Sequence, residues 1–361
     1  MELSRTALGS GAMPGKRFGV SKQALKGAAA ATAFALALIQ GGGFQAAAAD
    51  DWPNETLRMV IPSGPGGGTD TIARGLQKFL SEELGTSIRA ENLPGANHAL
   101  GAQAVAKSGS DCNTILAIYE PSLVTMAVAD AGLDFSYDDF YPLGGIIVEP
   151  FAILVPNNSR FKDWQSLWNE IVKHPGEVRV AITSWFDVTT VHLLEMEEQL
   201  GVKFNIIRYD GGSAGRAALL AGETDFGYHI LFGSRGVWDD TRTLAHFNAT
   251  KLHPRGDIST LVDNSPDLKD LVDAKLTDTV LTFSLYVTSG CHSENPERYN
   301  KLLNALRNVI DDPAYHETLK ELNMESGLLG VLGDDFFNIY KSMRPELEET
   351  INRLVVPRLG N

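Results

Sequence analysis

Cysteine is scarce in this sequence of 361 residues, which contains only Cys112 and Cys291. Two cysteines are too few for a disulfide-rich scaffold, and they lack the C-x-x-C spacing of a structural zinc site. Net positive charge is lacking too, since the formal charge at pH 7 is −14. Nucleic-acid binding is therefore not expected, because it needs a basic face. The remaining composition, 43% hydrophobic and 21% charged, is typical of a globular protein of about two domains.

Long apolar runs are also missing. The apolar stretch at residues 28–40 has about a dozen residues, whereas a transmembrane helix needs about twenty. Basic residues precede this stretch, and the small residues Ala47 and Ala49 follow it. That order is typical of a secretory signal peptide. We therefore expect residues 1–49 to be a signal peptide and the mature protein to be exported to the periplasm.

Export would place the two cysteines in an oxidising compartment, where a disulfide is possible. The sequence does not show whether Cys112 and Cys291 approach each other within bonding distance. A disulfide and a pair of buried free thiols both remain open.

The chain after residue 50 alternates strand-like and helical patterns, which indicates an α/β protein. Beyond about residue 290 the pattern is almost wholly helical. We expect strands at 57–61, 114–119, 151–155, 178–183, 204–209 and 279–288, and helices at 70–84, 160–173, 189–200, 213–222, 296–311, 314–323 and 334–354.

Two segments, 145–156 and 279–289, are longer and more continuously apolar than the other strands. Strands of this kind are suited to cross between two lobes, and no flexible linker or internal repeat is present. We expect lobe 1 to comprise residues 50–145 and 285–361, and lobe 2 to comprise residues 146–284.

A glycine-rich loop follows the first strand, where residues 60–70 read VIPSGPGGGTD. Glycines let a ligand approach the backbone, and the N-terminus of the following helix adds partial positive charge. The loop has no Lys or Arg, so its N–H groups would have to bind an anion. A plain strand-to-helix turn would need fewer glycines. We expect the binding residues here to be Ser63, Gly66, Gly67, Gly68, Thr69 and Asp70.

A second glycine loop, at residues 209–215, supplies Tyr209, Asp210 and Gly211 as further candidates. It also contains G-x-S-x-G at residues 211–215, the spacing of a hydrolase nucleophile elbow. A secreted serine hydrolase with Ser213 as its nucleophile is therefore an alternative. No HGGG-like oxyanion segment accompanies it, and Ser213 as a helix N-cap is the simpler interpretation.

Several motifs together resemble one known family, the solute receptors of tripartite tricarboxylate transporters, also called Bug-type periplasmic binding proteins. Residues 61–74 read IPSGPGGGTDTIAR and are similar to the family's opening motif. Residues 92–96, NLPGA, resemble its Asn-x-Pro-Gly-Ala segment. Weaker matches continue in order to about residue 230.

The resemblance implies a two-lobed periplasmic binding protein fold of type II, with the ligand between the lobes. It implies a small organic carboxylate as ligand, backbone amides of facing loops as its binding groups, and a permease of a tripartite tricarboxylate transporter as partner. We expect a monomer that is not an enzyme and needs no cofactor or metal. A sensor domain for a membrane kinase would share this fold and is a second alternative.

The sequence departs from the family where residues 184–190 read SWFDVTT and where Asp210 stands. Trp185 and Phe186 would narrow the cleft or stack on a flat ligand, or else pack in the core. Asp187 and Asp210 would meet an amino group, or else cap the helices that follow them. These departures favour an aromatic or amino-bearing acid. We add Thr189, and Tyr119 at the end of a strand, to the candidate binding residues.

Overall fold

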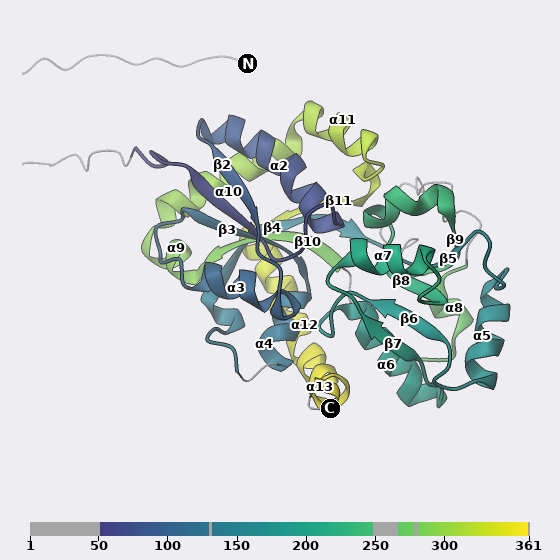
Figure 1. Cartoon of the computed structure of the whole chain (residues 1–361). Helices are drawn as coiled ribbons and strands as arrows, with labels where there is room; N and C mark the ends of the chain where they lie inside the picture. The colour runs from purple at the N-terminus through teal and green to yellow at the C-terminus, as the bar shows by residue number, and fades with distance from the viewer. Residues whose placement is uncertain (1–50, 130–131, 248–265, 278–280, 360–361) are drawn as a thin grey trace, which may run out of the picture. The chain divides into compact units, whose positions relative to one another are not determined.

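The computed structural model describes residues 51–129, 132–247, 266–277 and 281–359. The chain divides into two units, Met1–Asp51 and Trp52–Asn361, and all that follows concerns the second. The predicted signal peptide lies outside the described residues. The second unit contains a six-stranded sheet, ordered β11-β4-β10-β3-β1-β2, and a five-stranded sheet, ordered β7-β6-β8-β5-β9 (Figure 1). We call them the first and the second sheet.

The first sheet is built from both ends of the second unit. Its strands are β1 (Leu57–Ile61), β2 (Ile88–Asn92), β3 (Thr114–Glu120), β4 (Phe140–Glu149), β10 (Leu281–Thr288) and β11 (Leu328–Leu332). The helical segments that belong with it are α2 (Gly68–Leu84), η1 (Ala96–His98), α3 (Ala99–Ala106), α4 (Ser122–Ala129), η2 (Tyr137–Asp139), α9 (Ser289–Glu294), α10 (Pro296–Asp311), α11 (Pro313–Glu321), η4 (Glu325–Gly327), α12 (Gly333–Leu354) and α13 (Val356–Leu359).

Alternating residues of β1 explain why helices cover both faces of the first sheet. Met59 and Ile61 belong to a core that includes Ile72 and Leu76 of α2, whereas Val60 belongs to a second core with residues of α3, α4 and α12. Successive side chains of a strand point to opposite faces, so both faces are apolar and both must be covered. Accordingly, α2 and α10 lie on one side of this sheet and α3 and α4 on the other (Figure 1).

The second sheet is made from the middle of the chain. Its strands are β5 (Phe151–Pro156), β6 (Arg179–Ile182), β7 (Asn205–Arg208), β8 (Phe226–Ile230) and β9 (Thr241–Phe247), and its helical segments are α5 (Trp164–Lys173), α6 (Val188–Leu200), α7 (Gly212–Leu220), η3 (Phe232–Asp240) and α8 (Leu268–Leu271). Strand β6 pairs in parallel with β7 and β8. The loops after β6 and β7 therefore emerge at the same edge of the sheet, which is where ligands bind in open α/β sheets.

The chain passes from the first to the second sheet at Pro150. The segment 145–156, which we predicted as one strand, is two strands, because β4 ends at Glu149 and β5 begins at Phe151. Strand β4 pairs with β10 and β11, whereas β5 pairs with β8 and β9. A proline has no N–H group to continue a strand ladder, so it is a natural place for the pairing to change.

The other long apolar segment, 279–289, corresponds to β10, which pairs with β3 and β4 in the first sheet. The chain reaches it from β9 through an interval that includes residues 248–265 and 278–280, outside the described part. We keep the lobe boundaries near residues 145 and 285 as a proposal, although β4 runs to Glu149 and β10 begins at Leu281 in the first sheet.

The prediction of an almost wholly helical segment beyond residue 290 is wrong at β11. This strand reads LLGVL and pairs with β4 at the edge of the first sheet. Strands β2, β8 and β9 were also absent from our prediction. Edge strand β2 reads IRAEN and is largely unburied, so it lacks the continuous apolar pattern of a central strand.

Cys112 and Cys291 form a disulfide, with their Cα atoms 5.0 Å apart, which settles the question that the sequence left open. It joins the segment before β3 to α9. Within the described part of the chain, no helix combines the length and the apolar composition that crossing a membrane requires.

Candidate functional site

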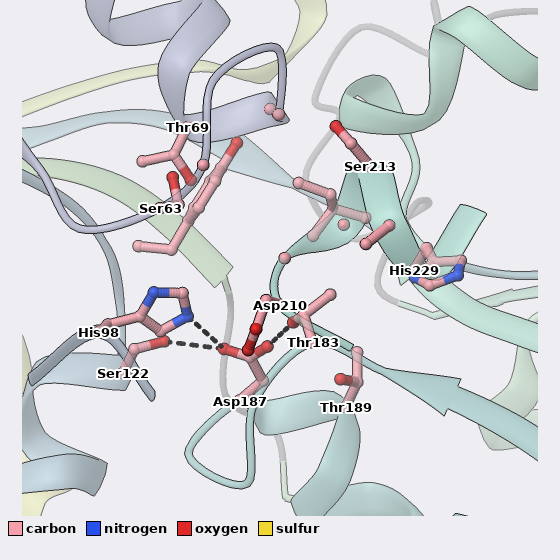
Figure 2. Close-up of a pocket in the computed structure, with 18 of the residues that line it drawn as sticks. Ser63, Thr69, His98, Ser122, Thr183, Asp187, Thr189, Asp210, Ser213 and His229 are labelled. Atoms are coloured by element: carbon pink, nitrogen blue, oxygen red, sulfur yellow. Dashed lines mark hydrogen bonds and ion pairs between the residues drawn. The ribbon is translucent and has the colours of Figure 1, made fainter. Parts of the chain in front are cut away.

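A cavity of about 290 Å³ lies between loops of the two sheets, and Figure 2 shows residues that line it. Nine of the fourteen candidate binding residues line the cavity: Ser63, Gly67, Gly68, Thr69, Tyr119, Asp187, Thr189, Asp210 and Gly211. The structure places the other five elsewhere: Gly66, Asp70, Trp185, Phe186 and Tyr209.

Asp70 holds the first glycine loop in shape and does not line the cavity. Its carboxylate accepts hydrogen bonds from the Gly66 N–H (2.9 Å), the Arg74 Nε (2.8 Å) and the Asn92 Nδ2 (2.9 Å). The Gly66 amide, which we expected to face a ligand, is therefore used inside the loop. These three hydrogen bonds hold the first glycine loop in shape. They do not use the N–H groups of the glycines that follow Gly66.

The N-terminus of α2 faces the cavity. Gly67 precedes the helix and Gly68 and Thr69 begin it, and the first N–H groups of a helix have no acceptor within it. Gly68 is closely packed, because a Cβ there would lie 2.7 Å from the Ile230 Cδ1, which would have to move, and 3.1 Å from the Gly233 Cα. Helix α2 thus approaches η3 at the close distance that two glycines permit, which brings the first loop against the second sheet.

Ser63 lies two residues after the end of β1, where the first glycine loop begins. The side chain is 8% exposed, lines the cavity, and its Oγ has no hydrogen-bond partner among the described residues. A buried hydroxyl without a partner costs free energy, so a ligand atom that accepts its hydrogen bond would stabilise the site.

The second glycine loop presents a cation that the sequence analysis missed. Gly211 has a φ of +98° and leads into α7, and Arg216 lies one turn into that helix. The Arg216 residue is 7% exposed, lines the cavity, and donates from Nη2 to the Ser213 Oγ at 3.3 Å. Its Nη1 has no partner among the described residues. The sequence analysis noted only that the first glycine loop lacks Lys and Arg, and the signal it missed is an arginine in the helix that follows the second glycine loop.

Ser213 does not have the surroundings of a hydrolase nucleophile. Its hydroxyl accepts from the Arg216 guanidinium, which cannot accept a proton at ordinary pH. His229 also lines the cavity, but burial, with a smaller effect from Arg216, lowers the pKa of its ring to about 3. No hydrogen bond joins Ser213 to a histidine in the described part of the chain, so the nucleophile–base contact of a triad is not formed.

Tyr119 lines the cavity from β3 and links the two sheets through a buried acid. Its hydroxyl donates to Glu149 at the end of β4, and the other Glu149 oxygen accepts from the Gly233 N–H at 3.1 Å. Burial raises the pKa of Glu149 to about 7 despite these bonds and the charge of Arg216. Burial and the neighbouring Glu149 raise the pKa of Tyr119 well above its usual value.

Asp187 lies at the N-terminus of α6, but its side chain does not cap the helix. The carboxylate faces the cavity, where Oδ1 accepts from the Ser122 Oγ at 3.2 Å and Oδ2 accepts from the Thr183 hydroxyl. The His98 Nε2 lies 4.0 Å from Oδ1 (Figure 2). Burial raises the pKa of Asp187, and His98 acts in the opposite direction. The capping alternative is therefore wrong for Asp187.

Asp210 lines the cavity with an exposed carboxylate, which pairs with the Arg208 Nη1 at 2.7 Å and caps no helix. Phe186 is 2% exposed and belongs to the core, and Trp185 packs against it. These two rings therefore take the core-packing alternative. The Tyr209 hydroxyl donates to Glu223 at 3.1 Å. Among the described residues, no group of three His, Cys, Asp or Glu side chains is placed to hold a metal ion.

The sequence matches the family described as tripartite tricarboxylate transporter family receptor over residues 72–329. Among curated proteins, a UPF0065 protein of Bordetella pertussis is 32% identical over 189 residues, covering 52% of this chain and 58% of that protein. The chain thus aligns with little more than half the length of this relative.

Two solved structures show the fold. The periplasmic binding protein BugD superposes with a TM-score of 0.72 at 19% identity, covering 84% of this chain and 98% of the other. MatC from Rhodopseudomonas palustris, with bound malate, superposes with a TM-score of 0.70 at 18% identity, covering 83% and 100%.

The fold and the interlobe cavity define a two-lobed α/β binding protein of the type II periplasmic class. Within that class, the chain belongs to the receptor family of the tripartite tricarboxylate transporters. The resemblance seen in the glycine-loop motifs is confirmed.

Proposed function

We propose that this protein is a periplasmic receptor that binds a small organic carboxylate in the cavity and delivers it to the permease of a tripartite tricarboxylate transporter. Family membership supports the receptor role, and the malate bound to MatC is an example of such a ligand in a protein of similar fold. The observation that supports a carboxylate ligand is the position of Arg216. Its buried guanidinium lines the cavity, and its Nη1 has no partner among the described residues.

A buried guanidinium with an unused donor is costly, and a carboxylate is the anion whose geometry fits it best. Burial lowers the pKa of Arg216, but a guanidinium keeps its proton at any ordinary pH. The helix N-termini of α2 and α7 add amide donors at the same cavity. We therefore revise the idea that backbone amides alone bind the ligand: a side-chain cation acts with them.

Binding would favour the closed arrangement of the lobes, because only there do loops of both sheets contact the ligand. We propose that the receptor acts as a monomer, in which loops of both sheets of one chain form the cavity. Size-exclusion chromatography with light scattering tests this: a stable dimer at micromolar concentration would contradict it.

Calorimetric titration of the purified mature protein with mono-, di- and tricarboxylates tests the carboxylate site. The variant Arg216→Gln should lose about 10- to 100-fold in affinity for the carboxylate that binds best, because a charged hydrogen bond contributes about 1.5–3 kcal/mol. Arg216→Lys should lose less, since it keeps the charge. The matched control Arg89→Gln removes an exposed arginine outside the cavity and should bind normally. Unchanged affinity in Arg216→Gln would refute the assignment.

The hydrolase alternative is tested by Ser213→Ala in an esterase assay. We expect no serine-dependent turnover, since no histidine contacts Ser213 in the described part of the chain. Activity that disappears in the variant would instead support the enzyme. The sensor alternative shares fold and cavity, and it is tested by whether deletion of the gene abolishes uptake of the ligand.

A further inference from the structure

The cavity has polar groups of opposite character at two separate places. Ser63, Thr69 and Ser213 lie toward one end, whereas Asp187 lies toward the other with His98 and Ser122 beside it (Figure 2). We call the first set, together with Arg216, the anion end, and the second set the acid end. A ligand that fills the cavity meets both.

The acid end has more acceptors than donors. Asp187 receives hydroxyl hydrogen bonds from Ser122 and Thr183, but a carboxylate can accept about four. Its third neighbour, the His98 Nε2 at 4.0 Å, is too far for a direct hydrogen bond. The Asp187 side chain is 15% exposed, so bulk water screens its charge poorly.

His98 lies beside this carboxylate without a direct hydrogen bond to it. The Nδ1 of His98 lies 2.7 Å from the Pro62 carbonyl oxygen, which can only accept, so Nδ1 carries a hydrogen. The Nε2 of His98 faces the Asp187 carboxylate at 4.0 Å. The lone pairs of Asp187 that Ser122 and Thr183 leave unused can accept from a ligand group with several N–H donors.

The anion end has hydrogen-bond donors where the acid end has acceptors. The Arg216 Nη1 and the Ser63 Oγ are buried donors without partners among the described residues, and both residues line the cavity. The cavity lining also has apolar side chains, which include Ile118, Phe151 and Leu281. Apolar side chains of this kind can contact the hydrocarbon part of a small ligand. They attract neither a positive nor a negative group.

We propose that the ligand is a small zwitterion of the amino-acid class, with its carboxylate at Arg216 and Ser63 and its ammonium group at Asp187. The inference deepens the proposed function and rests on it. An ammonium group has three donors and one positive charge, which matches the acceptors and the negative charge of the acid end. A simple dicarboxylate would instead place its second negative group against Asp187, an arrangement that like charges disfavour.

Matched ligand pairs test this proposal. Each pair compares an amino acid with the same acid lacking the amino group: glutamate with glutarate, leucine with 4-methylpentanoate, and phenylalanine with 3-phenylpropionate. In calorimetric titrations, the amino acid of the best-binding pair should bind about 10- to 100-fold more tightly than its partner, because the ammonium group adds a charged hydrogen bond in a poorly solvated site.

Asp187→Asn keeps the shape of the side chain and removes its charge, so it should reduce that preference to about 3-fold or less while the deaminated acid binds as before or better. The matched control Asp335→Asn removes the same charge from an exposed position on α12, outside the cavity, and should leave the preference intact. A thermal-unfolding curve verifies that both variants are folded.

The two proposals fail in different ways. If deaminated acids bind as tightly as amino acids, or if Asp187→Asn keeps the preference, the zwitterion proposal is overturned and the carboxylate receptor stands. If carboxylates and amino acids of the panel bind equally weakly to the wild type and to Arg216→Gln, both proposals are overturned.

Discussion

Two carboxyl groups are buried at the ends of strands of the first sheet. Glu120 ends β3 and Glu149 ends β4, and both residues are 0% exposed. Burial raises the pKa of Glu120 to about 8, although Tyr286 and the amides of Val124 and Leu123 oppose the shift. Near neutral pH both groups therefore carry a proton for part of the time, which limits the negative charge buried in the protein.

Glu120 makes the stability of the protein depend on pH. The folded-state pKa is about 8 and the ordinary value is 4.5, so the folded state holds a proton that the unfolded state loses between these values. The free energy of unfolding should therefore fall as pH rises through this window, by up to about 1.4 kcal/mol per pH unit from this group. In Glu120→Gln this part of the decline should vanish, as measured by urea unfolding from about pH 5 to about pH 9.

The exposed Glu321 provides the control for that measurement. Glu321→Gln removes a carboxyl group from an exposed site on α11, and its pH profile should follow that of the wild type. A Glu120→Gln profile parallel to the wild type would show that the Glu120 carboxyl is ionised in the folded protein.

At the scale of elements, the N-terminus of α2 determines how the first loop meets η3. Gly67 has extended backbone angles, φ −78° and ψ 173°, and a Cβ there would lie 3.6 Å from the Gly64 carbonyl oxygen, an ordinary contact. At Gly68 the added Cβ would meet Ile230 and Gly233 at 2.7 and 3.1 Å. An added methyl group is thus more crowded at Gly68 than at Gly67.

This difference predicts opposite results for two alanine variants. Gly68→Ala should push α2 away from η3 and weaken ligand binding by about 10-fold or more, because the loops of the two sheets no longer converge. Gly67→Ala should retain binding within a few-fold, since its methyl group meets only ordinary contacts. Titration with the ligand that binds the wild type best measures both, and equal affinities would contradict the steric account.

A larger side chain at Gly67 gives a separate expectation. The added Cβ would lie 4.0 Å from the Ser213 Oγ, so the longer branches of Gly67→Val would extend into the cavity between the two loops. Binding should be lost while the unfolding temperature stays within about 3 °C of the wild type, as thermal unfolding with and without ligand would show. Normal ligand binding by Gly67→Val would show that the first glycine loop is not part of the binding site.

At the scale of the whole molecule, the disulfide closes a long loop. Cys112 and Cys291 are 179 residues apart in sequence, and the chain between them includes the whole second sheet. A cross-link of this span reduces the entropy of the unfolded chain. The disulfide therefore joins the part of the chain before the second sheet to the part after it, and both parts belong to the first sheet.

Removing both thiols tests the contribution of the bridge. Cys112→Ala with Cys291→Ala should lower the free energy of unfolding by about 2–5 kcal/mol, measured by urea unfolding. A reducing agent should lower the free energy of unfolding of the wild type toward that of the variant. It should leave the free energy of unfolding of the variant unchanged. Equal midpoints for the oxidised wild type and the variant would show that the cross-link adds no stability.

The sequence alone predicted most of the elements, the family and the two glycine loops, because these follow from local periodicity and from glycines that permit close backbone approach, although β2, β8, β9 and β11 were missed. Which residues face the cavity depended on tertiary packing. Asp70 turns back to bind its own loop, Phe186 packs into the core, and Arg216 comes into the cavity from α7. Such choices depend on which elements pack together, and spacing along the chain does not carry that information.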